Sequence, residues 1–263
     1  MTAVGATMGP EDGDPEIACQ SQLGGVITTG GGFSTYYAQP SWQTDAVNAY
    51  FAGLSAGEQP SSGYNPNGRG IPDVSLIGVN YQVVIQDSFK TLFGTSASAP
   101  VFGAMLSVIN AERARSNLSS VGFINPTLYG YGMNNSFGED GGNFNPFQDV
   151  TSGHNKCAAY TGSNPSNAVC CQSGFYAIAG WDPVTGWGST GFPELAQMLA
   201  VEVNYTIPDG GDGGGNDSTL SLAVTIVIAV LGFALLVTLL ACAASLLCAP
   251  CAASTAVSTA SAV

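Results

Sequence analysis

The chain contains very few positively charged residues. Only 5 Lys or Arg residues stand against 18 Asp or Glu residues in 263, so the formal net charge is −13 at pH 7 and the pI is about 4.1. Because clustered basic side chains supply most of the affinity for phosphate backbones, this balance argues against a nucleic-acid partner. It suits a protein that stays soluble in an acidic lumen, where many carboxylates are neutral.

Histidine is almost absent as well. The single histidine, His154, lies in the loop formed by residues 152–156. A Ser-His-Asp triad needs an imidazole as its base, whereas a lone loop histidine is most often a solvated side chain. The sequence therefore gives little support to a mechanism that depends on histidine.

The most informative segment that is present is residues 94–100, Gly-Thr-Ser-Ala-Ser-Ala-Pro. Apolar side chains recur behind it, from Val101 to Ile109, with the spacing of one helix face. Ser96 is thus expected at a helix N-terminus, where free N–H groups and the helix dipole favour an oxyanion beside its hydroxyl. That arrangement is typical of a serine nucleophile, although Ser96 as a simple helix cap is the alternative.

Four further segments, read together with residues 94–100, carry a family resemblance. They are residues 2–7 (Thr-Ala-Val-Gly-Ala-Thr), 30–34 (Gly-Gly-Gly-Phe-Ser), 68–75 (Gly-Arg-Gly-Ile-Pro-Asp-Val-Ser) and 180–188 (Gly-Trp-Asp-Pro-Val-Thr-Gly-Trp-Gly). In order and spacing the chain resembles the C-terminal half of the catalytic domain of the sedolisin (serine-carboxyl) family, a branch of the subtilisin-like serine peptidases. The resemblance covers residues 1 to about 203.

The fold expected for residues 1–205 is one α/β unit. Strand-like runs occur at residues 25–28, 71–74 and 81–85, and helix-like runs at 44–52, behind Ser96, and at 192–202. Alternating strands and helices predict a parallel sheet with helices on both faces, and the resemblance implies a subtilisin-like sheet. Strands missing upstream would leave that sheet incomplete at its N-terminal side, with an open edge.

The resemblance implies a glutamate base oriented by an aspartate four residues away, and a further aspartate for the oxyanion, all upstream of the first matched strand. A carboxylate base implies activity in acid. No Glu-x-x-x-Asp pair occurs among the acidic residues before Ser96, which are Glu11, Asp12, Asp14, Glu16, Asp45, Glu58, Asp73 and Asp87.

Residues 11–16 resemble an acidic surface loop, and Asp73 is expected to have a structural hydrogen-bonding role. Since loss of a triad base costs about 10⁴-fold in rate, the chain as it stands is expected to be nearly inactive. It is either the C-terminal part of a longer peptidase or a short protein that no longer catalyses.

A calcium site is the second expectation. Asp149 and Asp182 lie on separate Gly-rich turns, and converging carboxylates and carbonyls form the oxygen shell that Ca²⁺ prefers. The resemblance implies a site made of Asp149, Asp182, a water and the carbonyls of Val150, Ile178 and Gly180, with Ile178 standing where a family member has glycine. The alternative is that both aspartates only cap turns.

Cysteines and glycosylation signals favour a secreted or lumenal domain. We predict two disulfides, one between Cys157 and either Cys170 or Cys171, and one between Cys19 and the remaining cysteine. Reduced, buried thiols of a cytosolic domain are the alternative. Asn-x-Ser/Thr sites occur at Asn117, Asn134, Asn204 and Asn216.

The composition changes after residue 205. Residues 206–219 form a Gly- and Asp-rich linker, expected to be flexible, and residues 249–263 form a Ser/Thr/Ala tail. Between them, residues 220–248 are almost wholly apolar and exceed the ~20 residues that cross a bilayer. We predict one transmembrane helix there, with a GPI-anchor signal as the alternative.

Together these patterns predict a serine-type peptidase that cleaves peptides or proteins, as an endopeptidase or a tripeptidyl peptidase. It is expected to be a single-pass membrane protein whose peptidase domain is lumenal, as in a lysosome or vacuole, or extracellular. The alternative is a non-catalytic, calcium-stabilised, membrane-anchored binding module.

Overall fold

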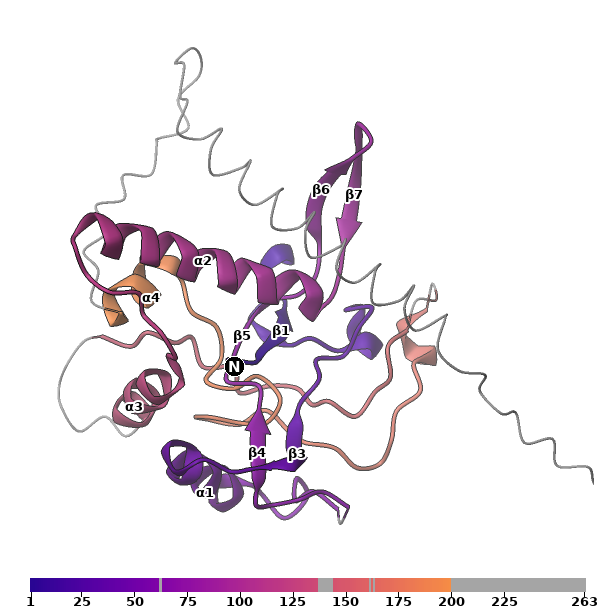
Figure 1. The fold of residues 1–263 in the computed structure, drawn as a ribbon. Coiled ribbons are helices and arrows are strands. Elements are labelled where there is room, and N and C mark those ends of the chain that lie inside the picture. Colours follow the sequence, from indigo (N-terminus) through magenta and orange to yellow (C-terminus); the bar gives the residue numbers. More distant parts are fainter. Residues whose placement is uncertain (62, 137–143, 161, 163, 200–263) are drawn as a thin grey trace, which may run out of the picture. The chain divides into compact units, whose positions relative to one another are not determined.

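The computed structural model describes residues 1–61, 63–136, 144–160, 162 and 164–199 (Figure 1). These residues belong to the first of two units into which the chain divides, Met1–Ile207. The predicted linker at 206–219, the predicted membrane span at 220–248 and the tail at 249–263 lie outside the described residues. Within the described ranges, no helix combines the length and hydropathy needed to cross a membrane.

The described part is mixed α/β. Its helices are α1 (Thr44–Gly53), α2 (Thr95–Arg115), α3 (Asn125–Ser136) and α4 (Phe192–Met198). Its strands are β1 (Val4–Met8), β2 (Ile17–Ala18), β3 (Gly32–Ala38), β4 (Gly68–Ile71), β5 (Val74–Ile77), β6 (Tyr81–Ile85) and β7 (Ser88–Leu92). Short 3₁₀ helices are η1 (Pro10–Asp12), η2 (Ser21–Leu23), η3 (Ser41–Gln43) and η4 (Pro165–Asn167).

A small central sheet supports the N-terminus of α2. Its strand order is β2-β1-β5, with β1 and β5 parallel in the register Val4↔Val74 to Thr7↔Ile77 and β2 antiparallel to β1. Helix α2 packs against both β1 and β5 (Figure 1). The middle of β1 is buried, as expected of a strand covered by neighbours on both faces.

The other strands do not join a single parallel sheet. Strands β3 and β4 pair antiparallel, and β6 and β7 form an antiparallel hairpin. The hairpin turns at Gln86 and Asp87, which both have positive φ, 50° and 58°. A two-residue turn with both φ values positive matches the twist of antiparallel strands. Because Gln-Asp is not a sequence signature of such a turn, the pattern at 81–85 predicted a strand but not its partner.

The expected strand at residues 25–28 is wrong. Val26 has φ 61°, and the Gly25 N–H donates to the Gln20 carbonyl at 3.0 Å. This segment turns back over Cys19 instead of extending. A β-branched residue with positive φ is unusual, so the apolar run Val26-Ile27 misled the prediction.

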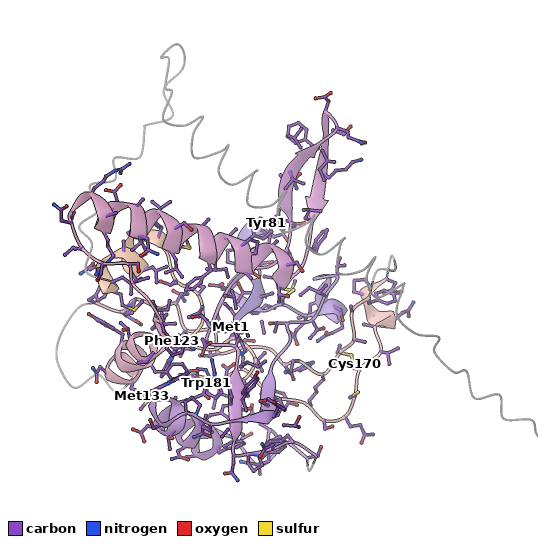
Figure 2. All side chains as sticks on the ribbon, in the orientation of Figure 1. Met1, Tyr81, Phe123, Met133, Cys170 and Trp181 are labelled. Atoms are coloured by element: carbon purple, nitrogen blue, oxygen red, sulfur yellow. A yellow bond between two sulfur atoms is a disulfide. The ribbon has the colours of Figure 1, made fainter. Side chains whose placement is uncertain are left out.

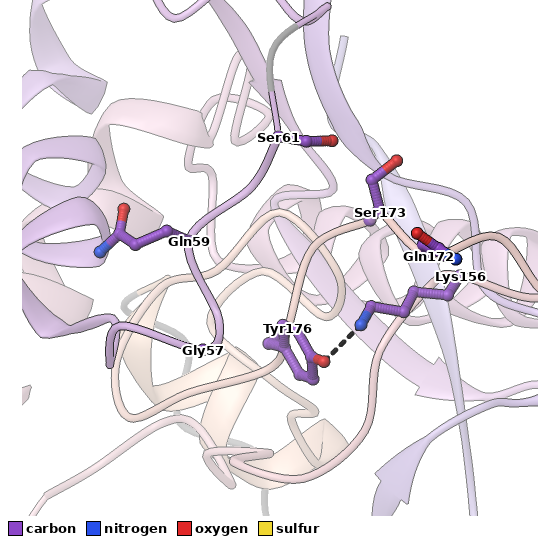
Figure 3. A pocket seen from close by; sticks show the side chains of 8 residues that line it. Gly57, Gln59, Ser61, Lys156, Gln172, Ser173 and Tyr176 are labelled. Atoms are coloured by element: carbon purple, nitrogen blue, oxygen red, sulfur yellow. Dashed lines mark hydrogen bonds between the residues drawn. The ribbon is translucent and has the colours of Figure 1, made fainter.

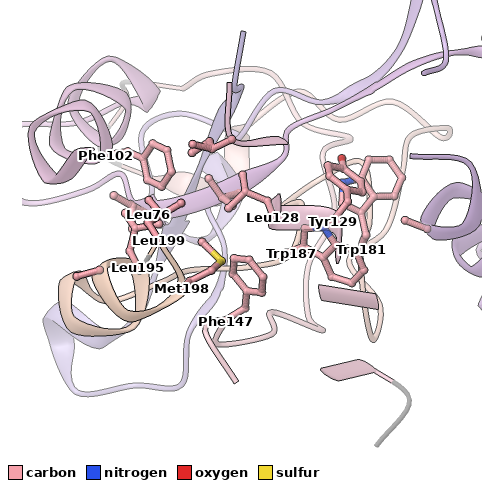
Figure 4. Packing of buried hydrophobic residues seen from close by; sticks show 14 of the residues in the cluster. Leu76, Phe102, Leu128, Tyr129, Phe147, Trp181, Trp187, Leu195, Met198 and Leu199 are labelled. Atoms are coloured by element: carbon pink, nitrogen blue, oxygen red, sulfur yellow. The ribbon is translucent and has the colours of Figure 1, made fainter. Parts of the chain in front are cut away.

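The helix predictions at residues 44–52 and behind Ser96 are confirmed, and helix α4 begins where predicted, at Phe192. The core between these helices and the central sheet is rich in aromatic rings (Figure 4). Trp181 is among its largest fully buried side chains, and its indole N–H donates to the Pro72 carbonyl at 3.0 Å. The core thus ties the C-terminal loops to the connection between β4 and β5.

One of the two predicted disulfides is confirmed. Cys157 bonds to Cys170, labelled in Figure 2. The second predicted bond is wrong, since Cys19 is a buried free thiol and Cys171 is an exposed one. The sulfur of Cys19 points into the core and lies 3.3 Å from the Ile27 carbonyl.

The two free thiols among the described residues, Cys19 and Cys171, are expected to differ sharply in reactivity. Burial, with a smaller contribution from the charge of Glu11, raises the pKa of the Cys19 thiol to about 12, so almost no thiolate is present and access is poor. Under native conditions, iodoacetamide should modify Cys171 at least about 100-fold faster than Cys19. Peptide-resolved mass spectrometry measures both rates, and denaturation should equalise them. Detection of a Cys19–Cys171 bond in the non-reduced digest would contradict the structure.

Candidate functional site

Ser96 lies in the first turn of α2. The N-cap of this helix is Gly94, with φ 130° and ψ 159°, a conformation open to glycine and strained for other residues. The Gly94 N–H donates to the Gly78 carbonyl at 2.6 Å, and its own carbonyl accepts the Ala97 N–H at 2.9 Å. These bonds attach the start of α2 to the end of β5. Gly94 rather than Ser96 therefore caps the helix.

The two serines of the motif have opposite environments. Ser96 is exposed, whereas Ser98 is fully buried and its hydroxyl has no hydrogen-bond partner among the described residues. The first N–H groups of a helix have no intrahelical acceptor. No side chain caps α2 and no acidic residue lies in its first turn, but Ala97 and Ser98 already donate their N–H groups to the Gly94 carbonyl. The N–H groups of Thr95 and Ser96 and the positive dipole end therefore remain available to an anion beside Ser96.

No base contacts the Ser96 hydroxyl within the described part of the chain. His154 is occupied elsewhere: its Nδ1 accepts the Lys156 N–H at 3.4 Å and its ring packs edge-on against Tyr176, with centroids 5.7 Å apart. Burial and the neighbouring Lys156 charge lower the His154 pKa. His154 is half-buried rather than fully solvated, and it belongs to a different cluster.

Asp73 has the structural role predicted for it. It is fully buried, and its carboxylate pairs with Arg69 at 2.5 Å. It also accepts the Ala3 N–H at 2.7 Å and the Tyr129 hydroxyl at 3.1 Å. These bonds connect the start of β1 to β4 and α3.

Asp182 is the more buried of the two aspartates that were predicted as calcium ligands. Its Oδ1 accepts the N–H groups of Val184 at 2.9 Å and Thr185 at 2.8 Å, and its Oδ2 accepts the Ile178 N–H at 3.1 Å. The carboxylate is completely buried, and this burial holds its pKa well above the usual aspartate range despite these bonds.

Asp149 approaches the same turn from the other loop. Its Oδ2 accepts the Gly180 N–H at 2.8 Å, while its Oδ1 is buried without a partner among the described residues. Burial raises the pKa of Asp149 as well. The carbonyl of Val150 lies 3.4 Å from the Thr185 hydroxyl, which also contacts Asp182. The five predicted ligand residues are therefore brought together.

Both carboxylates accept backbone N–H groups, as turn-capping aspartates do, and of their four oxygens only the Asp149 Oδ1 has no partner among the described residues. Within the described ranges, neither Asp149 nor Asp182 has a Lys, Arg or His partner, and an orphaned, buried carboxylate oxygen is costly unless it is compensated. No three His, Cys, Asp or Glu side chains gather at one place in this part of the chain. A cation held here would have at most two carboxylates and would need carbonyl or water oxygens for the rest of its shell.

The sequence missed two contributors to this region. Thr185 bridges the two loops, and a Thr three residues after an Asp is the only sign of such a turn. Glu16 was assigned to an acidic surface loop, but its carboxylate accepts the hydroxyls of Thr7 at 2.5 Å and Ser189 at 2.7 Å. It joins β1 to the C-terminal loops, a long-range contact that local charge patterning does not reveal.

The chain is similar to several known proteins. The chain is 39% identical to the probable tripeptidyl-peptidase SED3 of Trichophyton verrucosum over 200 residues, which are 76% of this chain and 30% of that protein. It is 39% identical to physarolisin of Physarum polycephalum over 175 residues, 66% of this chain and 27% of the relative.

A vertebrate relative is likewise matched over only part of its length. Tripeptidyl-peptidase 1 of Canis lupus familiaris is 41% identical over 173 residues, which are 65% of this chain and 27% of the relative. No protein-family model matches the chain. The chain thus spans less than a third of the length of each of these curated relatives.

Proposed function

Because this chain belongs to the sedolisin family of peptidases, we propose that it forms the nucleophile-bearing part of a serine-type peptidase acting on peptides or proteins. The observation that carries the proposal is the position of Ser96, exposed in the first turn of α2 beside free N–H groups. The proposal predicts that activity depends on the Ser96 hydroxyl and not on that of Ser98. The relatives are named as peptidases, which favours this function over a non-catalytic binding module.

In the proposed reaction, the Ser96 Oγ attacks the carbonyl carbon of the scissile peptide bond. The C–O bond forms as the carbonyl π electrons move onto oxygen, and the hydroxyl proton passes to a base. The helix N–H groups stabilise the oxyanion. As the intermediate collapses, the base returns the proton to the leaving nitrogen, the C–N bond breaks and the amine is released. An acyl-enzyme remains, and water hydrolyses it.

The base is proposed to lie outside this chain. No described carboxylate or imidazole hydrogen-bonds to Ser96, and the relatives are more than three times as long as the matched region. We place the Glu-Asp pair and the oxyanion aspartate, which the family resemblance implies, in the part of the relatives that this chain does not span. Without them, turnover by this chain is expected to be very slow.

The parallel β1–β5 pair is proposed to form part of a larger, subtilisin-like parallel sheet, with α2 packed on it. We further propose that the two C-terminal loops hold one Ca²⁺ through Asp149, Asp182 and the carbonyls of Val150, Ile178 and Gly180. The unpartnered Asp149 Oδ1 supports this proposal. The ion would stabilise the buried carboxylates and fix the loops, with no part in the peptide chemistry.

Residues 220–248 are proposed to anchor the protein as a single span, with the peptidase domain lumenal or extracellular. Expressed behind a signal peptide, the protein should stay in the membrane pellet through a carbonate wash, because an apolar span of this length inserts essentially irreversibly. Asn204 should receive a glycan, and a sequon engineered at Ser258 should not.

Two other outcomes would replace this topology. Release by a phosphatidylinositol-specific lipase would indicate a GPI anchor. Recovery in the soluble fraction with an intact C-terminus would reject both forms of anchoring.

A further inference from the structure

A polar pocket of about 350 Å³ has none of Ser96, Asp149 and Asp182 in its lining (Figure 3). One wall follows the end of α1, and the other comes from the loops on either side of the Cys157–Cys170 disulfide. The lining residues are Gly57, Gln59, Ser61, Lys156, Gln172, Ser173, Gly174 and Tyr176. None of them is acidic, although acidic residues outnumber basic ones 18 to 5 in the chain. We call this the Lys156 pocket.

Lys156 is the cation of this pocket. Its ammonium donates to the Tyr176 hydroxyl, as Figure 3 shows, and lies 4.2 Å from the centroid of the same ring. An ammonium carries three donors, and the Tyr176 hydroxyl uses one. The tyrosine ring therefore positions the charge without neutralising it.

The three arginines of the chain are already engaged. Arg69 pairs with Asp73, Arg115 pairs with a glutamate on its own helix, and Arg113 donates to two backbone carbonyls at 2.7 Å. Lys156 forms no salt bridge with any residue that the structure describes. A concave site thus presents a cation that lacks a carboxylate partner.

The walls that carry this charge are held in place. The Asn155 N–H donates to the Phe175 carbonyl at 3.1 Å, and the Phe175 N–H donates to the Asn155 Oδ1 at 2.8 Å. The Cys157–Cys170 disulfide follows immediately after Lys156. A site held in this way loses little conformational entropy when a ligand binds.

We propose that the Lys156 pocket binds a carboxylate group of a peptide. The ammonium supplies a charge-assisted hydrogen bond, and the hydroxyls of Ser61 and Ser173 and the amide of Gln172 supply neutral donors around it. The nearest acidic residue in sequence on the facing wall, Glu58, is outside the lining, and its carboxylate accepts the Ser55 N–H at 3.0 Å. The carboxylate comes from a peptide C-terminus or from an acidic side chain.

Equilibrium binding tests the proposal without any need for turnover. Saturation-transfer NMR would compare three probes on the full chain carrying Ser96→Ala: acetyl-trialanine, its C-terminal amide, and acetyl-Ala-Glu-Ala amide. The free acid should bind about two- to fivefold more tightly than the amide, the scale of one partly exposed ion pair. If the glutamate peptide binds as tightly as the free acid, the pocket accepts any carboxylate. If the glutamate peptide binds only as weakly as the trialanine amide, the ligand is the C-terminal carboxylate.

Matched variants locate the site. Lys156→Met should abolish the preference for the free acid, and Lys156→Arg should retain it. Lys90→Met makes the same change of charge at an exposed position of β7 and should leave the preference intact. Equal binding of acid and amide by the parent chain would overturn the proposal, as would a preference that survives Lys156→Met or is lost equally in Lys90→Met. None of these outcomes depends on whether Ser96 is the nucleophile.

Discussion

Replacing Ser96 with alanine is expected to lower kcat/KM for peptide hydrolysis by at least about 10³-fold, because no other atom at this position can form the acyl-enzyme. The measurement needs the catalytic base. Residues 1–199 would therefore replace the matching segment of the dog tripeptidyl-peptidase 1, with which the chain is 41% identical over 173 residues. Tripeptide release at acidic pH would be compared for the chimaera and its variants.

Ser98→Ala is the matched control for this prediction. It makes the same substitution two residues along the same helix, but the Ser98 hydroxyl is buried and has no partner among the described residues. Removing an unsatisfied hydroxyl costs little stability, so activity should remain within about threefold. Activity of Ser96→Ala within about tenfold of the parent chimaera would reject Ser96 as the nucleophile, provided that all variants melt at similar temperatures.

Removal of Ca²⁺ is expected to lower the melting temperature of this chain by about 5 °C or more. A ligand that binds only the folded state, at about 100 times its Kd, stabilises that state by about 2.7 kcal/mol, which for a domain of this size corresponds to a shift of that order. Thermal unfolding at neutral pH, with millimolar Ca²⁺ or with chelator, measures the effect. Coincident melting curves under the two conditions would remove the basis for the site.

Asp149→Asn gives the sharper test of the calcium proposal. The amide retains an oxygen that can accept the Gly180 N–H but removes the charge, so the fold should persist while the response to Ca²⁺ is lost. Asp182→Ala should lose the response and also destabilise the protein, because it removes the acceptor of three backbone N–H groups. Asp12→Ala changes an exposed residue of η1 and should leave the response unchanged.

Local elements could be predicted from the sequence alone. The spacing of apolar residues behind Gly94 predicted helix α2. It also predicted that Ser96 lies at the start of that helix. Helix α1 and the start of α4 were predicted on the same grounds. These features depend on neighbours three or four residues apart, so the periodicity of the sequence is sufficient to reveal them.

Pairing between distant segments was decided by the tertiary structure. Strand β6 pairs with β7 because of positive φ values at Gln86 and Asp87, and Cys19 remains unpaired because its sulfur lies inside the core. Both outcomes depend on where a turn places the chain. Spacing in the sequence does not contain that information.

For the candidate sites too, the sequence predicted some features and the tertiary structure decided others. The sequence motifs, read with the family resemblance, predicted Ser96 as the nucleophile and Asp149 and Asp182 as calcium ligands, because the chemistry of these residues and the motifs around them are local. Only the tertiary structure showed that Ser98 is buried beside Ser96 and that Asp149 has an unpartnered oxygen. Burial and hydrogen-bond satisfaction are sums over neighbours that are distant in the chain, so packing decides them and local sequence does not.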